Sequence, residues 1–261
     1  MRMMKSPQAT SNNDLSNFER IQKVLAKLGL GSRRAIEELI KNGKIKVNNK
    51  QATLGQLIDG NEIIHVNNRR FYFNKKKDFL TRILIYHKNE GEIVSHSDPK
   101  HKNTIFQNLP KAKNGKWISI GRLDINTSGL ILLTNNGELS NRLMHPRYEI
   151  EREYSVRILG EVSEQIFKNI KSGVKLEDGI AKVKLFEHTG GEGANQWYRI
   201  ILSEGRNREV RRIVESQGLK VSRLMRVRYG QFILPSFLKR GKFYELSESD
   251  VNNILKDFNL N

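Results

Sequence analysis

Near its start the chain alternates apolar and polar residues, first with the period of a helix and then with that of a strand. Apolar side chains recur at helical spacing over Phe18–Leu28 and again over Ser32–Lys41, where Ser32 supplies an N-cap. Lys44–Val47 then alternates strictly, and the Asn48–Asn49 pair after it is typical of a hairpin turn. The pattern predicts a small module of two short helices and a hairpin.

Beyond residue 80, strand-like and helix-like segments alternate. The predicted strands are Arg82–His87, Glu92–Ser95, Trp117–Ile120, Leu130–Leu133, Tyr154–Leu159, Ala181–His188, Trp197–Leu202 and Val221–Arg228. The predicted helices are Thr104–Leu109, Glu138–Met144, Ser163–Ser172 and Arg206–Gln217. Gly190–Gly193 lacks the residues of a phosphate-binding loop and is interpreted as the loop of a hairpin. Strands separated by helices predict an α+β domain with a central mixed sheet.

The two patterned regions predict two domains. Asn74–Asp78 is charged and has no apolar residue, which is typical of a linker. We therefore expect an RNA-docking domain over 18–77 and a larger domain over 78–255. Residues 1–17 are polar and rich in Ser and Asn, so they are expected to form a disordered tail.

The charge of the chain indicates a polyanionic partner. Its 261 residues carry a net charge of +18, and residues 18–77 hold fourteen Lys and Arg against five Asp and Glu. The cations of the predicted module that we expect to bind RNA are Arg20, Lys23, Arg33 and Arg34. The alternative is an ordinary solvated basic face. A membrane-binding protein would need an amphipathic helix with large exposed apolar residues or a long apolar segment, and the sequence has neither.

The composition of the chain also excludes several kinds of catalytic and metal site. The chain has no cysteine, which excludes disulfides, thiolate catalysis and Cys-ligated zinc and fits a cytoplasmic protein. Its six histidines are scattered, so we expect no metal site. We also expect no cofactor, because the chain has no Gly-rich loop with the spacing of a phosphate or dinucleotide site. The strong positive charge favours a monomer.

One carboxylate stands out. Asp124 lies in the segment Gly121–Leu130, between two apolar strand-like runs, on a stretch rich in Asn, Thr, Ser and Gly. A lone acid on a loop carried by a sheet is a common place for chemistry. The alternative is an Asx-turn, in which the Asp124 side chain caps the backbone near Asn126 or Thr127.

A basic run far along the chain decides between these interpretations. Together, the segments Gly121–Asp124 (GRLD) and Glu204–Arg212 (EGRNREVRR) resemble the pseudouridine synthases, in the branch that acts on ribosomal RNA at single sites. Phe18–Asp59 resembles an S4 RNA-binding domain. Three further stretches are similar to one subgroup that acts on the large ribosomal subunit: His145–Pro146, Gly190–Trp197 and Val221–Gly230.

The resemblance implies roles for individual residues. It implies that Asp124 is the catalytic aspartate, that Arg211 pairs with it, and that Tyr154 of the segment Arg152–Tyr154 faces the target base. Leu202 resembles the apolar residue that packs against the base. It also implies a mostly antiparallel sheet with a cleft across it. Without the family resemblance, the alternative for Arg211 is a helix-surface arginine that binds phosphate or pairs with Glu215. The alternative for Tyr154 and Leu202 is that both are core residues.

The sequence thus predicts an enzyme that isomerises a uridine of ribosomal RNA to pseudouridine, most specifically in 23S rRNA. Four arginines are expected to hold phosphates around an extruded nucleotide: Arg122, Arg206, Arg208 and Arg212. Two alternatives remain open at this point, a 16S rRNA enzyme and a non-catalytic rRNA-binding assembly factor. A methyltransferase or zinc deaminase is disfavoured, because the chain has neither a cofactor-binding Gly loop nor Cys/His zinc ligands.

Overall fold

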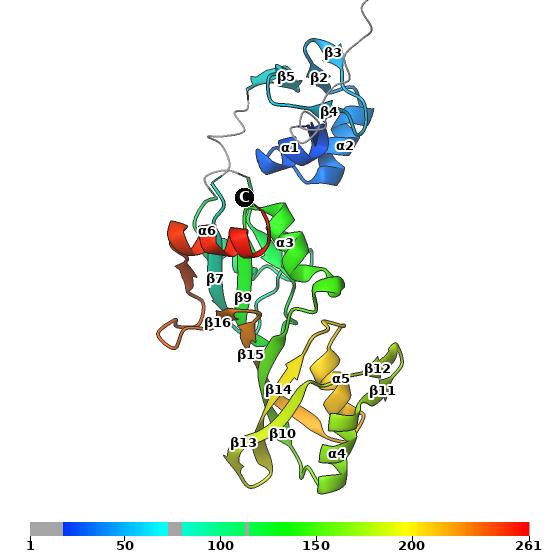
Figure 1. Ribbon diagram of the computed structural model, residues 1–261, viewed down its shortest axis with the longest axis vertical. Helices are drawn as coiled ribbons and strands as arrows, with labels where there is room; N and C mark the ends of the chain where they lie inside the picture. The colour runs from blue at the N-terminus through cyan, green and yellow to red at the C-terminus, as the bar shows by residue number, and fades with distance from the viewer. Residues whose placement is uncertain (1–17, 73–79, 113–114, 261) are drawn as a thin grey trace, which may run out of the picture. The chain divides into compact units, whose positions relative to one another are not determined.

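The computed structural model describes residues 18–72, 80–112 and 115–260. These residues form two compact units (Figure 1). One contains the residues up to 80 together with 112–116, and the other contains 81–111 and the residues from 117 onward. The expected tail and the expected linker Asn74–Asp78 lie outside the described residues.

The N-terminal unit is a four-stranded sheet packed against two helices. The helices are α1 (Ile21–Lys27) and α2 (Arg33–Lys41), and Ser32 accepts a hydrogen bond from the amide of Ala35 as the N-cap. The sheet order is β3-β2-β5-β6, and a separate pair is formed by β1 and β4. The strands are β1 (Glu19–Arg20), β2 (Ile45–Val47), β3 (Lys50–Gln51), β4 (Leu57–Ile58), β5 (Ile64–Val66) and β6 (Arg69–Phe71).

Both predicted helices and the predicted hairpin of this unit are confirmed. Asn48 and Asn49 have φ of 48° and 68°, the left-handed pair that a tight hairpin turn needs. The first helix starts later than expected, because Glu19 and Arg20 pair with Leu57 and Ile58 as a short strand.

The second unit is built on a nine-stranded sheet. Its order is β13-β14-β10-β15-β9-β7-β17, with β16 paired to β15 and β8 paired to β9. All these pairings are antiparallel except that of β9 with β15. The strands are β7 (Ile83–Lys88), β8 (Ile118–Ile120), β9 (Ser128–Thr134), β10 (Arg152–Leu159), β13 (Leu185–Glu192), β14 (Asn195–Leu202), β15 (Lys220–Tyr229), β16 (Phe232–Ile233) and β17 (Phe243–Glu245).

Two hydrophobic cores divide this sheet into halves. Helices α3 (Gly137–Met144) and α6 (Glu248–Asp257) pack on β7 and β9 through Leu139, Leu143, Val251 and Ile254. Helices α4 (Glu164–Ser172) and α5 (Glu209–Glu215) pack on β10, β13 and β14 through Ile170, Val210, Ile213 and Val214. Figure 1 shows α3 and α6 beside β9, and α4 and α5 beside β10 and β14. The parallel β9–β15 pairing joins the two halves.

The remaining elements are small. A hairpin of β11 (Val174–Leu176) and β12 (Gly179–Ala181) follows α4. Two 3-10 helices cover Ile105–Asn108 and Pro146–Tyr148. Within the described ranges, no helix is long and apolar enough to span a bilayer.

The predicted α+β class with a mixed, mostly antiparallel sheet is confirmed, but three predicted segments are wrong in detail. Glu92–Ser95 is a loop in which only Ile93 bridges to Thr104, because the Glu92 carboxylate is held by the Tyr86 hydroxyl and the Asn89 amide at 2.8 Å each. Gly190 and Gly191 lie inside β13 at a bulge, so the hairpin turn comes later.

The helix predicted from Arg206 begins only at Glu209. Arg208 has a left-handed φ of 48°, and Glu209 Oε2 accepts a hydrogen bond from the amide of Arg206 at 3.2 Å. Residues 206–208 therefore form a loop, which changes the direction in which the arginines of this segment point.

Candidate active site

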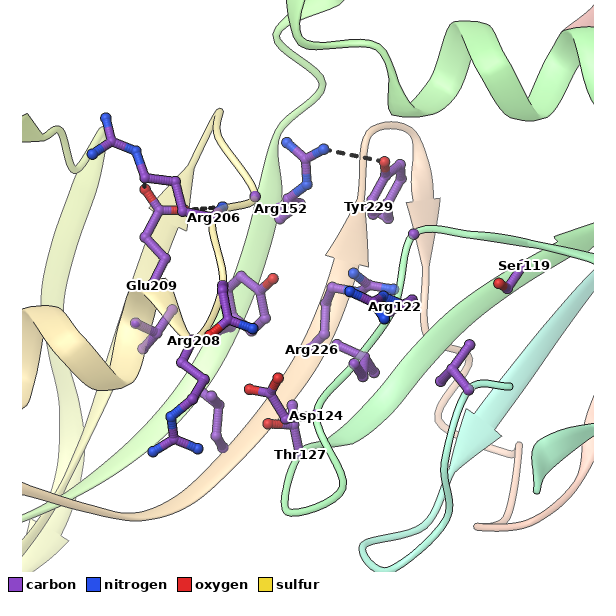
Figure 2. Close-up of a pocket in the computed structure, with 18 of the residues that line it drawn as sticks. Ser119, Arg122, Asp124, Thr127, Arg152, Arg206, Arg208, Glu209, Arg226 and Tyr229 are labelled. Carbon is purple, nitrogen blue, oxygen red and sulfur yellow. Dashed lines mark hydrogen bonds and ion pairs between the residues drawn. The ribbon is translucent and has the colours of Figure 1, made fainter. Parts of the chain in front are cut away.

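Asp124 lies on the loop that joins β8 to β9. This loop is closed by a backbone hydrogen bond from the Thr127 amide to the Asp124 carbonyl at 3.0 Å. Among the described residues, no hydrogen bond or ion pair forms to the Asp124 carboxylate, so the turn is not an Asx-turn. The side chain is half-buried and faces the cleft, as Figure 2 shows. A carboxylate in this position is available to a substrate.

A buried lysine holds the same loop from behind. Lys88, the last residue of β7, is 0% exposed. Its Nζ donates to the carbonyl oxygens of Asp124 at 3.1 Å, Ile125 at 3.3 Å and Thr127 at 2.8 Å, and also to its neighbour Asn89 at 2.9 Å. Burial lowers the pKa of Lys88 to about 8, while the charges of Glu92 and Asp124 oppose that shift. The ammonium thus fixes the backbone that carries Asp124.

Arg211 also contacts this loop, but not through the carboxylate. It is buried on α5, and its guanidinium donates to the carbonyls of Asn126 at 2.8 Å and Val221 at 3.3 Å. Burial and the nearby charge of Arg208 lower the pKa of Arg211, and the negative charge of Asp124 raises it. The expected ion pair between Arg211 and Asp124 does not form among the described residues. Its guanidinium instead donates to two carbonyl oxygens and so links α5 to β15 and to the Asp124 loop.

The cleft that Asp124 faces has a volume of about 710 Å³. Tyr154, at the start of β10, lines it and is only partly buried against the core, which differs from a fully buried core tyrosine. Leu202, at the end of β14, lines the cleft while 1% exposed, so it belongs to the core and to the cleft wall at once. The structure therefore brings Asp124, Tyr154 and Leu202 to one cavity.

The predicted phosphate-binding arginines divide into two groups. Arg122, Arg206 and Arg208 line the cleft, and Arg122 is exposed there. Arg212 is not among the lining residues; it pairs with Asp178 at 2.9 Å.

Neighbouring acids neutralise much of this basic run. Arg206 pairs with Glu204 at 2.5 Å and with Asp178 at 3.3 Å, and Arg208 pairs with Glu215 at 3.5 Å. Asp178 lies in the turn of the β11–β12 hairpin, far from the arginines in sequence. The rim is therefore less basic than the sequence of the run indicates.

Arg152, Glu209 and Arg226 also line the cleft. Arg152 donates to the carbonyls of Ile150 and Ser203 at 2.8 Å each. Glu209 is 4% exposed, and burial raises the pKa of its carboxyl. Arg226, on β15, is 2% exposed. All three lie in segments that carry the family resemblance, namely Arg152–Tyr154, Glu204–Arg212 and Val221–Gly230.

The predicted RNA-binding cations of the first unit are found at its surface. Arg20, Arg33 and Arg34 are exposed. Lys23 instead contacts Glu19 at 3.1 Å, as does Lys27 at 2.8 Å. One acid thus shares the face that carries two of the lysines.

The cleft thus combines an unpartnered carboxylate, an aromatic ring and a cationic rim. These are the features expected of an enzyme that acts on RNA. The model of the RNA pseudouridylate synthase family matches residues 82–216, and the S4 domain model matches residues 19–64. This chain belongs to the RNA pseudouridine synthase family, whose members are isomerases.

Several relatives share the name ribosomal large subunit pseudouridine synthase B. The relative from Pseudomonas aeruginosa is 48% identical over 243 residues, which cover 93% of this chain and 63% of the relative. Relatives from Haemophilus influenzae and Salmonella typhi are also 48% identical over 93% and 90% of this chain, and 68% and 81% of their own lengths are covered. This chain thus spans less than two thirds of the P. aeruginosa relative. A crystal structure of a pseudouridylate synthase has a TM-score of 0.61 at 25% identity, covering 90% of this chain and 99% of that one.

Proposed function

We propose that this chain isomerises a uridine of 23S rRNA, in the large ribosomal subunit, to pseudouridine. The observation that carries the proposal is the Asp124 carboxylate, which faces the cleft without a partner among the described residues while Lys88 and Arg211 hold its backbone. The name shared by the relatives supports the large-subunit target.

The proposed reaction can be carried out by side chains of the protein alone. The N1–C1′ bond of a uridine breaks, the base turns, and C5 bonds to C1′. The C5 proton then leaves, and N1 gains a proton. No atom is gained or lost, so the balance requires neither a redox cofactor nor ATP. The ionised Asp124 carboxylate acts at the sugar, either by adding to C1′ or by removing a sugar proton. Both routes need a charged acid in a cavity that holds one base.

Tyr154 and Leu202 form the walls that receive the base. The Tyr154 ring stacks on the flipped uracil, and its hydroxyl takes part in removing the C5 proton. Arg122 and Arg208 at the rim bind the flanking phosphates. Arg211 acts as a positioning residue through the backbone of the Asp124 loop.

We assign the two tasks of the protein to two domains. Residues 18–77 anchor the rRNA through Arg20, Lys23, Arg33 and Arg34, and residues 78–255 carry out the chemistry. We also propose that the protein works as a monomer in the cytoplasm.

Asp124→Asn tests the assignment because it keeps the shape of the side chain and removes its charge. We expect the single-turnover rate of tritium release from C5-labelled rRNA transcripts to fall by about 10⁴-fold or more, with RNA affinity within a few fold of wild type. Asp98→Asn is the matched control in the same cleft, since the Asp98 carboxylate is already held by the amides of Lys100 and His101 at 2.8 and 2.9 Å. Near-normal release by Asp124→Asn would remove Asp124 from the chemistry.

The target is tested separately. Pseudouridines in rRNA from cells that lack the protein can be mapped by carbodiimide modification and primer extension. We expect one site to disappear from 23S rRNA and to return with the wild-type protein but not with Asp124→Asn. Loss of a site in 16S rRNA instead would reject the proposed substrate.

A further inference from the structure

Arg226 has hydrogen-bonding capacity that the protein itself does not use. It lines the cleft from β15 and is 2% exposed. Its Nε donates to the carbonyl of Leu130 at 2.8 Å, and its guanidinium lies 4.9 Å from the centre of the Tyr229 ring. Its Nη2 is buried and has no hydrogen-bond partner in the described chain. A buried, charged donor without an acceptor costs stability, so its retention indicates a ligand that supplies the acceptor.

The backbone explains why this arginine faces the cleft. In β10 and β15, Tyr154 pairs with Arg226, but the preceding residue Glu153 pairs with Arg228, so β15 has one extra residue at a bulge. Arg228 consequently lies on the opposite face, where it pairs with Glu151 and Glu153 at 3.0 and 2.9 Å. Arg226 remains on the face of Tyr154.

A glycine brings Arg226 close to the catalytic loop. Gly129 pairs with Arg226 in the parallel β9–β15 contact and has φ of 104°. A Cβ at residue 129 would lie 2.2 Å from the Arg226 carbonyl oxygen and 2.7 Å from its amide nitrogen, so only glycine fits. Figure 2 shows Arg226 reaching from β15 into the pocket that Asp124 also faces.

Resting on the function proposed above, we propose that Arg226 binds a carbonyl oxygen of the target uracil and stabilises the uracil anion. When the N1–C1′ bond breaks, its electron pair leaves with N1, and the charge spreads over N1, O2 and O4. C1′ gains its electrons from the Asp124 carboxylate or from a neighbouring C–H bond whose proton is removed. Both routes therefore release the same anion, and a fixed cation at one of its oxygens lowers the barrier.

The position of Arg226 favours the base over a phosphate. Phosphates remain on the backbone of the RNA, where the exposed Arg122 and the rim residue Arg208 meet them. Arg226 is instead buried, and it pairs in the sheet with Tyr154, the residue assigned to the base. Contact with Nη2 requires a small side-chain movement at the cleft floor, of the kind that commonly accompanies binding.

The test compares RNA containing uridine at the target position with RNA containing 5-fluorouridine there. Fluorine makes the base more acidic and its anion a better leaving group, so stabilisation by the protein matters less. For Arg226→Gln at saturating RNA, we expect the single-turnover rate of nucleotide conversion to fall about 10²- to 10³-fold with uridine. With 5-fluorouridine we expect the fall to be at least about tenfold smaller. Arg226→Lys should show the same selectivity with a smaller effect, and it carries the test if the Gln variant does not fold.

Arg228→Gln is the matched control, because it changes an arginine of the same strand on the opposite face. We expect its rates with the two substrates to stay in the wild-type ratio. Equal slowing of both substrates by Arg226→Gln would overturn the inference. A change confined to RNA affinity and its salt dependence would show that Arg226 binds a phosphate and would also overturn it. If wild-type protein converts neither RNA, the proposed function fails instead, which is a separate result.

Discussion

The two units use their cations in opposite ways. In the described part of the N-terminal unit no Lys or Arg is buried, and Arg33 and Arg34 are exposed at the surface. The second unit buries Lys88, Arg211 and Arg226, at 0%, 8% and 2% exposure. All three donate to backbone carbonyls rather than to carboxylates.

Because of this difference, the exposed cations contribute to RNA affinity, and the buried cations contribute to the geometry of the active site. Exposed cations attract RNA through a field that salt screens, so they set how tightly and how fast the RNA binds. Buried cations are shielded from salt and act through fixed hydrogen bonds, so they set the geometry of the loop and the cleft. The net charge of +18 therefore indicates the partner, whereas the few cations that water does not reach shape the site.

Removing a buried cation tests this contrast most strongly. Lys88→Met keeps the length of the side chain and leaves the carbonyls of the Asp124 loop without their donor. We expect the single-turnover rate to fall about 100-fold, the reduction associated with a displacement of about 1 Å, and RNA affinity to stay within a few fold. Lys184→Met serves as the control, because Lys184 is 44% exposed at its side chain. A normal rate for Lys88→Met would mean that the loop holds its shape alone.

The pH dependence of stability tests whether Lys88 is buried as a cation. Burial holds the pKa of Lys88 at about 8, below the value of about 10.4 in an unfolded chain. Between these values the unfolded chain binds more protons than the folded protein, so stability rises with pH. In urea titrations, the free energy of unfolding of wild type relative to Lys88→Met should rise by about 1 kcal/mol per pH unit from about pH 8 to 10 and be flat below about 7. A constant difference would show that the four carbonyls fully offset burial.

Exposed cations should give the smallest effect. We expect the double variant Arg33→Ala, Arg34→Ala to lower the slope of log affinity against log salt by about 0.7 to 0.9 for each phosphate that it no longer neutralises. The single-turnover rate at saturating RNA should not change. Filter binding across a salt series, paired with kinetics on the same protein, provides the measurement. An unchanged slope would place the RNA on another surface of the protein.

Local signals in the sequence predicted the parts of the fold that depend on neighbouring residues. Ser32 caps the helix that it was expected to cap, and Asn48–Asn49 forms the predicted turn. Asp124 and Tyr154 could be placed near a cleft from their segments and the family resemblance. Their catalytic roles remain predictions.

The features that were missed depend on pairings between distant segments. Simple alternation puts Arg226 and Arg228 on one face, and only the bulge against β10 separates them. Lys88 ends an apolar strand, where a lysine ordinarily turns to solvent, and three of its four acceptors lie about forty residues later. Asp178 reaches Arg206 and Arg212 from a hairpin that the sequence pattern did not predict.

The parallel contact between β9 and β15 has a consequence for folding. It pairs Ser128 with Met225 and Gly129 with Arg226, nearly a hundred residues apart, whereas β7 with β9 and β13 with β14 join closer segments. Contacts that close long loops carry an entropic cost and form slowly, and this junction is one of the long-range contacts of the sheet. Asp124 belongs to one half and Tyr154 to the other. The cleft therefore exists only in copies in which this junction has formed, and a copy that lacks the junction has no site with which to modify RNA.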